Sequence, residues 1–217
     1  ADEAYWLVQR YPAGVDLLVV DHYEWSAELE ARCDGWARRL LVIDDRAMTS
    51  HHCHVLLDQT LGRDVAAYAN LVPPSCEVIA GAHYALVRST FPEARTRILP
   101  RRSSPGTVDR ILVNFGGGDQ GVLVGRALRA IQALDFSGRV DVVAAREPRC
   151  VDGDNVSFEL RHHSGVDDMA ALMADADIGV GAGGTSVYER LCLGLPSVVV
   201  VTAVNQSDQA SALARAE

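Results

Sequence analysis

The chain has 217 residues, a length between the sizes of one and two average domains. Hydrophobic residues make up 48% and charged residues 23%, and this balance excludes a disordered, collagen-like or disulfide-scaffold protein. The formal charge is −9 and all 20 basic residues are arginine, so Schiff-base chemistry and a P-loop lysine are excluded. Because an acidic chain without a basic run disfavours nucleic acid and anionic membranes as partners, we expect a small-molecule ligand.

Cysteine usage and the length of the apolar runs bear on location. The five cysteines are scattered and form no C-x-x-C pair, a pattern typical of reduced thiols in a cytoplasm. The longest apolar runs, such as residues 196–203, are far shorter than the roughly 20 residues that a membrane span needs. We therefore expect a cytoplasmic protein without a membrane-spanning segment.

The first half of the chain predicts strands alternating with helices. Residues 1–10 are helix-like, the apolar runs 15–20 and 40–43 predict buried parallel strands, and residues 26–34 between them have helical character. A short strand at 54–57 follows, and residues 84–87 begin a helix or turn. The Pro- and Gly-punctuated segment 100–106 predicts a linker between a domain of residues 1–100 and a domain of residues 107–217.

The second half shows the same alternation more clearly. Strands are predicted at 110–115, 140–145, 156–160, 177–181 and 196–201. Helices are predicted at 122–134, 166–175, from about residue 185, and at 206–216. Short apolar strands with helical crossovers indicate an α/β fold in which parallel sheets are covered on both faces.

A first glycine-rich turn, residues 114–119, follows a predicted strand and precedes a helix. Gly117, Gly118 and Asp119 are candidate nucleotide-binding residues, since glycines let backbone N–H groups approach a phosphate at a helix start. The alternative is a tight turn in which Asp119 only caps the helix.

A second glycine-rich turn, residues 181–189, has the same position after a later strand. Loops at the carboxyl ends of parallel strands form the ligand crevice of such folds, so the two turns reinforce each other. Ser186 and Glu189 have the spacing of a capping box, in which Glu189 would only close the helix start. The functional alternative is that Glu189 accepts hydrogen bonds from a ribose diol.

A third candidate site follows the first strand. Asp21 and His22 could form an acid–base pair, although neighbouring strand residues point to opposite faces. The histidines at 51, 52 and 54 suggest a metal, but no second ligand pair at zinc-site spacing accompanies them, so we expect no metal site. His162 is placed in a loop that could flank a ligand, and Asn205 is an ordinary helix-cap residue.

Several segments together resemble known families. Residues 165–196 resemble the nucleotide-binding half of GT-B glycosyltransferases of the MurG type. Residues 21–23, the segment 44–58, the segment 81–91 and the pair 205–206 resemble the PseG family, the UDP-2,4-diacetamido-2,4,6-trideoxy-β-L-altropyranose hydrolases of pseudaminic acid biosynthesis. The resemblance spans nearly the whole chain.

The resemblance implies two Rossmann-like domains of GT-B architecture facing a cleft, with UDP held mainly by the second. It implies phosphate and ribose contacts at Gly117, Gly118, Gly184, Thr185, Ser186 and Glu189, and uracil against the loop that contains His162 and Val166. Tyr23 and Asn205 match positions that the family places beside the sugar or the attacking water. Asp21 and His22 are the best remaining proton-handling groups of this chain, and we expect them to orient the base or the water. Neither a metal nor another cofactor is implied.

One departure concerns the catalytic base. Relatives carry this base in a Gly-His turn near the start, and no Gly-His pair occurs in this sequence. We therefore expect an incomplete amino-terminal domain that lacks the base. The expected activity is hydrolysis of a UDP-linked amino sugar to UDP and free sugar. A transferase of the same fold and a non-catalytic nucleotide-sugar-binding protein are the alternatives.

Overall fold

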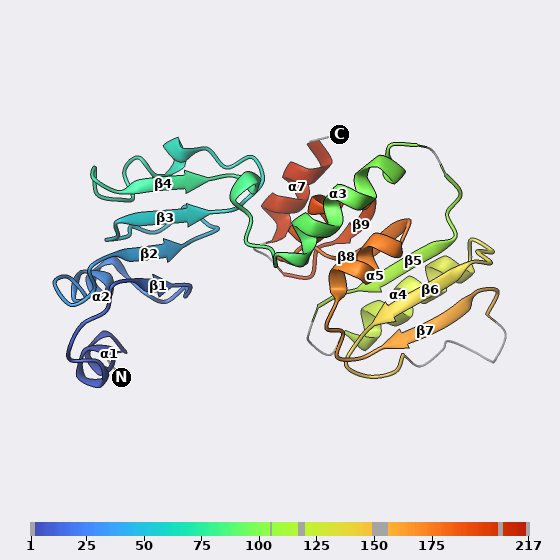
Figure 1. Ribbon diagram of the computed structural model, residues 1–217, viewed down its shortest axis with the longest axis horizontal. Helices are drawn as coiled ribbons and strands as arrows, with labels where there is room; N and C mark the ends of the chain where they lie inside the picture. The colour runs from blue at the N-terminus through green and yellow to red at the C-terminus, as the bar shows by residue number, and fades with distance from the viewer. Residues whose placement is uncertain (1–2, 105, 117–119, 149–155, 204–205, 216–217) are drawn as a thin grey trace. The chain divides into compact units, whose positions relative to one another are not determined.

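The computed structural model describes residues 3–104, 106–116, 120–148, 156–203 and 206–215. The chain forms two compact units, Ala1–Leu86 and Val87–Glu217 (Figure 1). Each unit is built on its own parallel sheet, so the predicted α/β class with two Rossmann-like parts is confirmed. The division between the units lies earlier in the chain than the linker expected at 100–106.

The first unit holds four parallel strands in chain order. The strands β1 (Leu18–Val20), β2 (Leu40–Ile43), β3 (Val55–Asp58) and β4 (Glu77–Ala80) pair successively (Figure 1). The helices are α1 (Glu3–Arg10) and α2 (Ala27–Ala31), with 3-10 turns η1 (Val65–Tyr68) and η2 (Ala82–Tyr84). Alternate strand residues such as Leu40 and Val42 are buried in one apolar cluster. Strand β1 is shorter than predicted, because Val15 forms only an isolated bridge with Ala37.

The second unit holds five parallel strands in the order β7-β6-β5-β8-β9. Their bounds are β5 (Arg110–Asn114), β6 (Arg139–Val143), β7 (Glu159–His163), β8 (Ile178–Ala182) and β9 (Ser197–Val200). The chain begins in the central strand β5, adds strands on one side and then crosses to the other. The order therefore reverses between β5 and β8, the place where doubly wound sheets bind ligands beyond the carboxyl ends of their strands.

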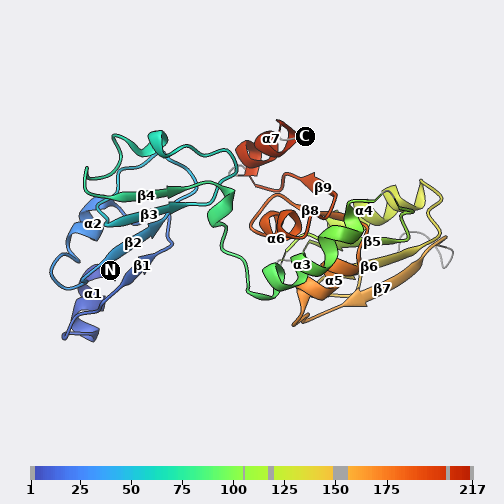
Figure 2. The same ribbon diagram turned by 45° about the horizontal axis from the view of Figure 1, so that its top comes forward.

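Helices cover both faces of this sheet. The helices are α3 (Thr90–Arg102), α4 (Gly121–Gln132), α5 (Met169–Asp175), α6 (Ser186–Cys192) and α7 (Ser207–Arg215). One apolar cluster joins α3 and α5 to the sheet and another joins α4 to it, and Figure 2 shows α3 beside α5. Both faces of the central strands β5 and β6 are thus buried, as the apolar strand pattern predicted, whereas the edge strands β7 and β9 are partly exposed.

Helix α3 occupies part of the segment that was expected to be a linker. Its composition is polar, but Phe91 and Ile98 are buried against the second unit. The Arg102 guanidinium donates hydrogen bonds to the carbonyls of Leu193 (2.8 Å), Met173 (2.7 Å) and Ala176 (2.9 Å), near the carboxyl ends of two neighbouring helices. The linker prediction did not anticipate this helix, because tertiary contacts at otherwise unpaired carbonyls stabilise it.

Two smaller differences concern strands. Strand β7 begins three residues later than the predicted 156–160 and includes His162, which was expected in a loop. Strand β7 lies at the edge of the sheet, where polar side chains are tolerated and the apolar signal is weak. Among the residues that the structure describes, no helix combines the length and apolar character needed to cross a membrane.

Candidate functional site

The candidate site of the second unit lies where β5 and β8 end. Asn114, the last residue of β5, is 8% exposed, and its side-chain oxygen accepts a hydrogen bond from the Gly116 amide at 2.8 Å. Gly116 has φ +96°, a left-handed conformation that favours glycine. A Cβ on Gly181 would overlap the Asn114 carbonyl oxygen, so only glycine lets these two strand ends approach so closely. Gly117, Gly118 and Asp119 lie outside the described residues.

The glycine turn, residues 183–186, follows β8 directly. A Cβ on Gly183 would lie 3.3 Å from the Gln206 Cβ, and one on Gly184 would lie 3.6 Å from Gln206 Nε2. The Gln206 side-chain oxygen accepts hydrogen bonds from the Thr202 amide (2.9 Å) and hydroxyl (3.0 Å). This contact brings the start of the last helix against the glycine turn. Asn205 lies outside the described residues.

Glu189 lies on the first turn of α6. The residue that caps this helix is Thr185 rather than Ser186, so the pair Ser186 and Glu189 does not form the capping box. The Glu189 carboxylate makes no hydrogen bond to any residue within the described ranges. It is half-buried, and burial raises its pKa, while the charges of Arg88 and Arg190 oppose that rise. The carboxylate is therefore a hydrogen-bond acceptor without a described partner beside the glycine turn.

Two arginines supply positive charge near Glu189. Arg88 is exposed, and its guanidinium lies 3.5 Å from the Asp167 carbonyl, which accepts its hydrogen bond. Arg190 is 3% exposed and lies under the glycine turn. Neither arginine was singled out from the sequence, because nothing local distinguishes them from the other arginines of the chain.

The segment expected to contact uracil lies at the ends of β6 and β7. His162 shares a hydrogen bond of 2.9 Å with the Ala144 carbonyl, and its ring nitrogen Nε2 is the donor. His163 Nε2 lies 2.7 Å from Asp141 Oδ1. Val166 is half-buried against the apolar cluster around α5. Both histidines thus have partners within the fold, and the backbone after β7 remains the candidate contact surface.

The first unit carries a different group of polar side chains at the carboxyl edge of its sheet. The exposed Tyr23 hydroxyl lies 3.1 Å from both carboxylate oxygens of Asp45, to which it donates. Arg46 lies over the Tyr23 ring at 5.3 Å. Burial is the largest cause of a raised pKa at Asp45, and the Tyr23 hydrogen bond opposes it. The predicted pair Asp21 and His22 shares no hydrogen bond.

A buried polar network supports this edge. The Tyr68 hydroxyl lies 2.9 Å from Asp44 Oδ2 and 2.8 Å from Asp58 Oδ2, and Asp58 also pairs with Arg63 at 2.5 Å. Arg63 donates a second hydrogen bond, of 2.9 Å, to the Asp45 carbonyl. These residues were not predicted as a group, although Asp44 and Asp58 adjoin the ends of successive strands, which is a usable signal.

The histidines of residues 51–54 point to separate partners. His51 Nδ1 lies 2.9 Å from the buried Glu30 carboxylate, and His52 Nε2 lies 2.8 Å from Asp34. His54 Nδ1 accepts a hydrogen bond of 3.1 Å from the Leu40 amide. In the described part of the chain, no three His, Cys, Asp or Glu side chains gather as a metal site.

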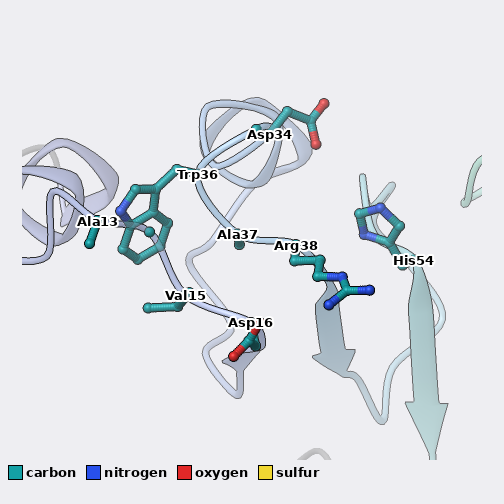
Figure 3. A pocket seen from close by; sticks show the side chains of 10 residues that line it. Ala13, Val15, Asp16, Asp34, Trp36, Ala37, Arg38 and His54 are labelled. Atoms are coloured by element: carbon teal, nitrogen blue, oxygen red, sulfur yellow. The ribbon is translucent and has the colours of Figure 1, made fainter.

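The first unit also has a cavity of about 600 Å³. Figure 3 shows Arg38 and His54 in its wall, beside the points where β2 and β3 begin, with Asp16 nearby. The cavity therefore lies at the amino edge of the sheet, opposite the edge that carries Tyr23 and Asp45. It includes none of the predicted site residues.

The chain was compared with known proteins both by sequence and by structure. The chain matches no protein-family profile. It is 28% identical over 127 residues, 55% of this chain and 26% of the relative, to an uncharacterized protein of Methanocaldococcus jannaschii. It is 36% identical over 77 residues, 35% of this chain and 28% of the relative, to the UDP-2,4-diacetamido-2,4,6-trideoxy-beta-L-altropyranose hydrolase of Campylobacter jejuni.

The matched regions thus span about a quarter of the length of these curated relatives. Among solved structures, MurG of Acinetobacter baumannii is similar with a TM-score of 0.64 at 16% identity, over 98% of this chain and 60% of that one. At this identity the likeness concerns the fold. The chain therefore has a MurG-like α/β fold and partial sequence similarity to a UDP-sugar hydrolase.

Proposed function

We propose that this chain binds UDP at the carboxyl edge of the second unit's sheet, as part of an enzyme that hydrolyses a UDP-linked diacetamido trideoxy sugar. The observation that carries the proposal is the half-buried Glu189 carboxylate beside the glycine turn, at the point where the strand order reverses. The partial similarity to a UDP-sugar hydrolase supports the choice of nucleotide and of reaction.

In this proposal Glu189 accepts hydrogen bonds from the two ribose hydroxyls. The diphosphate lies against the glycine turn, where Gly184, Thr185 and Ser186 offer backbone N–H groups, and Arg88 adds positive charge. The turn 114–119, with Gly117, Gly118 and Asp119, contributes further phosphate contacts. Uracil lies along the backbone between His162 and Val166. The second unit, Val87–Glu217, is then the UDP-binding part, and the first unit, Ala1–Leu86, serves the sugar.

The reaction is attack of a water oxygen on the anomeric carbon of the sugar. The bond between that carbon and the diphosphate oxygen breaks, its electron pair leaves with UDP, and the proton of the water goes to a base. Tyr23, held by Asp45, contacts the sugar or the water, together with Asn205. Asp21 and His22 are the proton-handling groups on the first unit. Positive charge near the diphosphate stabilises the leaving group.

Calorimetric titration with UDP tests the binding step, and release of UDP from the intact UDP-sugar without an acceptor tests hydrolysis. We expect UDP to bind and the UDP-sugar to be hydrolysed very slowly, because loss of a positioned general base costs roughly 10²- to 10⁴-fold in rate. A protein that releases UDP only when an acceptor hydroxyl is supplied is a transferase of the same fold. A protein that binds UDP and never releases it from the UDP-sugar is a non-catalytic nucleotide-sugar-binding protein. Absence of UDP binding refutes the proposal.

A further inference from the structure

Strand β8 carries glycine at two positions that face one buried side chain. A Cβ on Gly179 would lie 3.0 Å from Arg190 Cδ, and a Cβ on Gly181 would lie 2.8 Å from Arg190 Nη1. The Arg190 side chain therefore fills the space that these glycines leave along the strand. The two glycines of β8 thus leave the room that the Arg190 side chain on α6 occupies.

The Arg190 guanidinium connects the two ends of the glycine turn. Nη2 donates a hydrogen bond of 2.7 Å to the carbonyl of Ala182, the last residue of β8. Nη1 lies 3.3 Å from the hydroxyl oxygen of Ser186, the first residue of α6. Between these two contacts lie Gly183, Gly184 and Thr185. The guanidinium thus fixes the distance between the end of β8 and the start of α6, which the turn connects.

The charge of Arg190 is not balanced by a hydrogen-bonded carboxylate. Its Nε is buried without a hydrogen-bond partner, and no described carboxylate oxygen lies within ion-pair distance of the guanidinium. Burial lowers its pKa to about 10, with the charge of Glu189 opposing, so the group stays protonated at neutral pH. An apolar side chain of similar volume would fill this space without the cost of burying a charge.

We propose that Arg190 is a positioning residue for the diphosphate of a nucleoside diphosphate. It holds the glycine turn through Ala182 and Ser186, and the anionic ligand at that turn balances its buried charge. This inference rests on the proposed function and adds a residue to it. UDP binding then has two separable contributions: Glu189 contacts the ribose, and Arg190 acts on the diphosphate through the turn.

The test compares Arg190→Met with the wild-type protein by calorimetric titration with UDP and uridine and by thermal unfolding. We expect UDP to bind Arg190→Met roughly tenfold or more weakly, because the variant loses both the buried positive charge under the diphosphate and the contacts that hold the turn. Uridine affinity stays within about twofold, and the melting temperature without ligand is unchanged or higher. Arg190→Lys keeps the charge but loses the two-ended contact, so we expect it to recover part of the UDP affinity.

Arg139→Met is the matched control. Arg139 is also largely buried in the same sheet, but it pairs with Asp141 at 2.8 Å where β6 begins. This variant should lower the melting temperature and leave the ratio of UDP to uridine affinity unchanged. Equal losses of UDP and uridine affinity in Arg190→Met, or a lowered melting temperature with unchanged UDP affinity, would assign Arg190 a purely structural role and overturn the inference.

Inorganic pyrophosphate separates failure of this inference from failure of the proposed function. If the wild-type protein does not bind UDP, the proposed function is refuted, and Arg190 is then tested with pyrophosphate alone. Pyrophosphate that raises the melting temperature of the wild type but not of Arg190→Met supports the inference. Pyrophosphate that shifts both equally, or neither, overturns it.

Discussion

Replacement of Glu189 by Gln separates ribose binding from helix stability. The substitution keeps the side-chain length and removes the charged acceptor. In the proposed complex the carboxylate accepts two charge-assisted hydrogen bonds, and loss of charge from such an interaction costs about 1.5–3 kcal/mol, or roughly 10- to 150-fold in UDP affinity. Glu189 makes no hydrogen bond within the described fold, so the substitution breaks none, and it also relieves the burial of a charge, which outweighs the attraction of Arg88 and Arg190.

The sign of the stability change follows from the pKa of Glu189. Burial raises this pKa in the folded state, so ionisation of the carboxyl opposes folding, and its stabilising contribution falls as the pH rises through the folded-state pKa. The glutamine side chain of E189Q does not ionise, so the melting temperature of this variant near neutral pH should be unchanged or slightly higher.

Calorimetry with UDP and thermal unfolding measure the two effects on the same samples. Glu93→Gln is the control, because Glu93 is an exposed acidic residue in the first turn of α3 in the same unit. It should alter neither UDP affinity nor its nucleoside selectivity. A lowered melting temperature with unchanged UDP affinity in E189Q would refute the reasoning and return Glu189 to a role in helix capping.

Three further perturbations test other parts of the structure. Burial lowers the pKa of His51, but Glu30 and Asp44 raise it by more, so the pKa in the folded state is above the ordinary value. The protonated His51 therefore stabilises the fold below about pH 6.5, and this contribution is lost as the pH rises through the folded-state pKa. Urea unfolding should therefore show Glu30→Gln to be destabilised more below about pH 6.5 than at alkaline pH, and an equal loss at both would contradict the coupling. Gly181→Ala should destabilise the second unit by roughly 1–3 kcal/mol in urea, because its Cβ would overlap the Asn114 carbonyl; an unchanged midpoint would disprove that packing. Excess EDTA should leave calorimetric UDP binding intact because arginines and backbone N–H groups carry the phosphate charge, whereas dependence on added Mg²⁺ would show that a metal is required.

The alternation of strands and helices in the second unit could be predicted because most of its strands, such as β5 and β9, contain apolar runs. The position of the second glycine turn followed from the same pattern. The packing roles of the glycines could not be predicted. Gly181 was placed where the predicted strand meets the turn, but the pattern did not show that its missing Cβ accommodates Asn114 and Arg190. Local sequence shows that a glycine is present, but only packing shows which neighbour needs the space.

The elements that were missed depend on contacts between distant residues. Strand β4 has only four residues, one of them charged, and its pairing with β3 defines it. Helix α3 is polar and contains Pro100, yet Arg102 anchors it to carbonyls about 70 to 90 residues away. The partnership of Tyr23 with Asp45 is of the same kind, because the two residues follow different strands.

The polar groups at the two sheet edges differ in the hydrogen bonds that they leave available. In the first unit, Asp58 accepts from Tyr68 and Arg63, so these buried groups satisfy one another and hold the edge rigid. In the second unit, the Glu189 carboxylate and the Arg190 Nε have no hydrogen-bond partner within the described residues. Buried polar groups without partners cost free energy unless something binds them. The second edge is therefore the one whose polar groups gain most from a ligand: hydroxyl donors would satisfy Glu189, and a diphosphate at the glycine turn would balance the buried charge of Arg190.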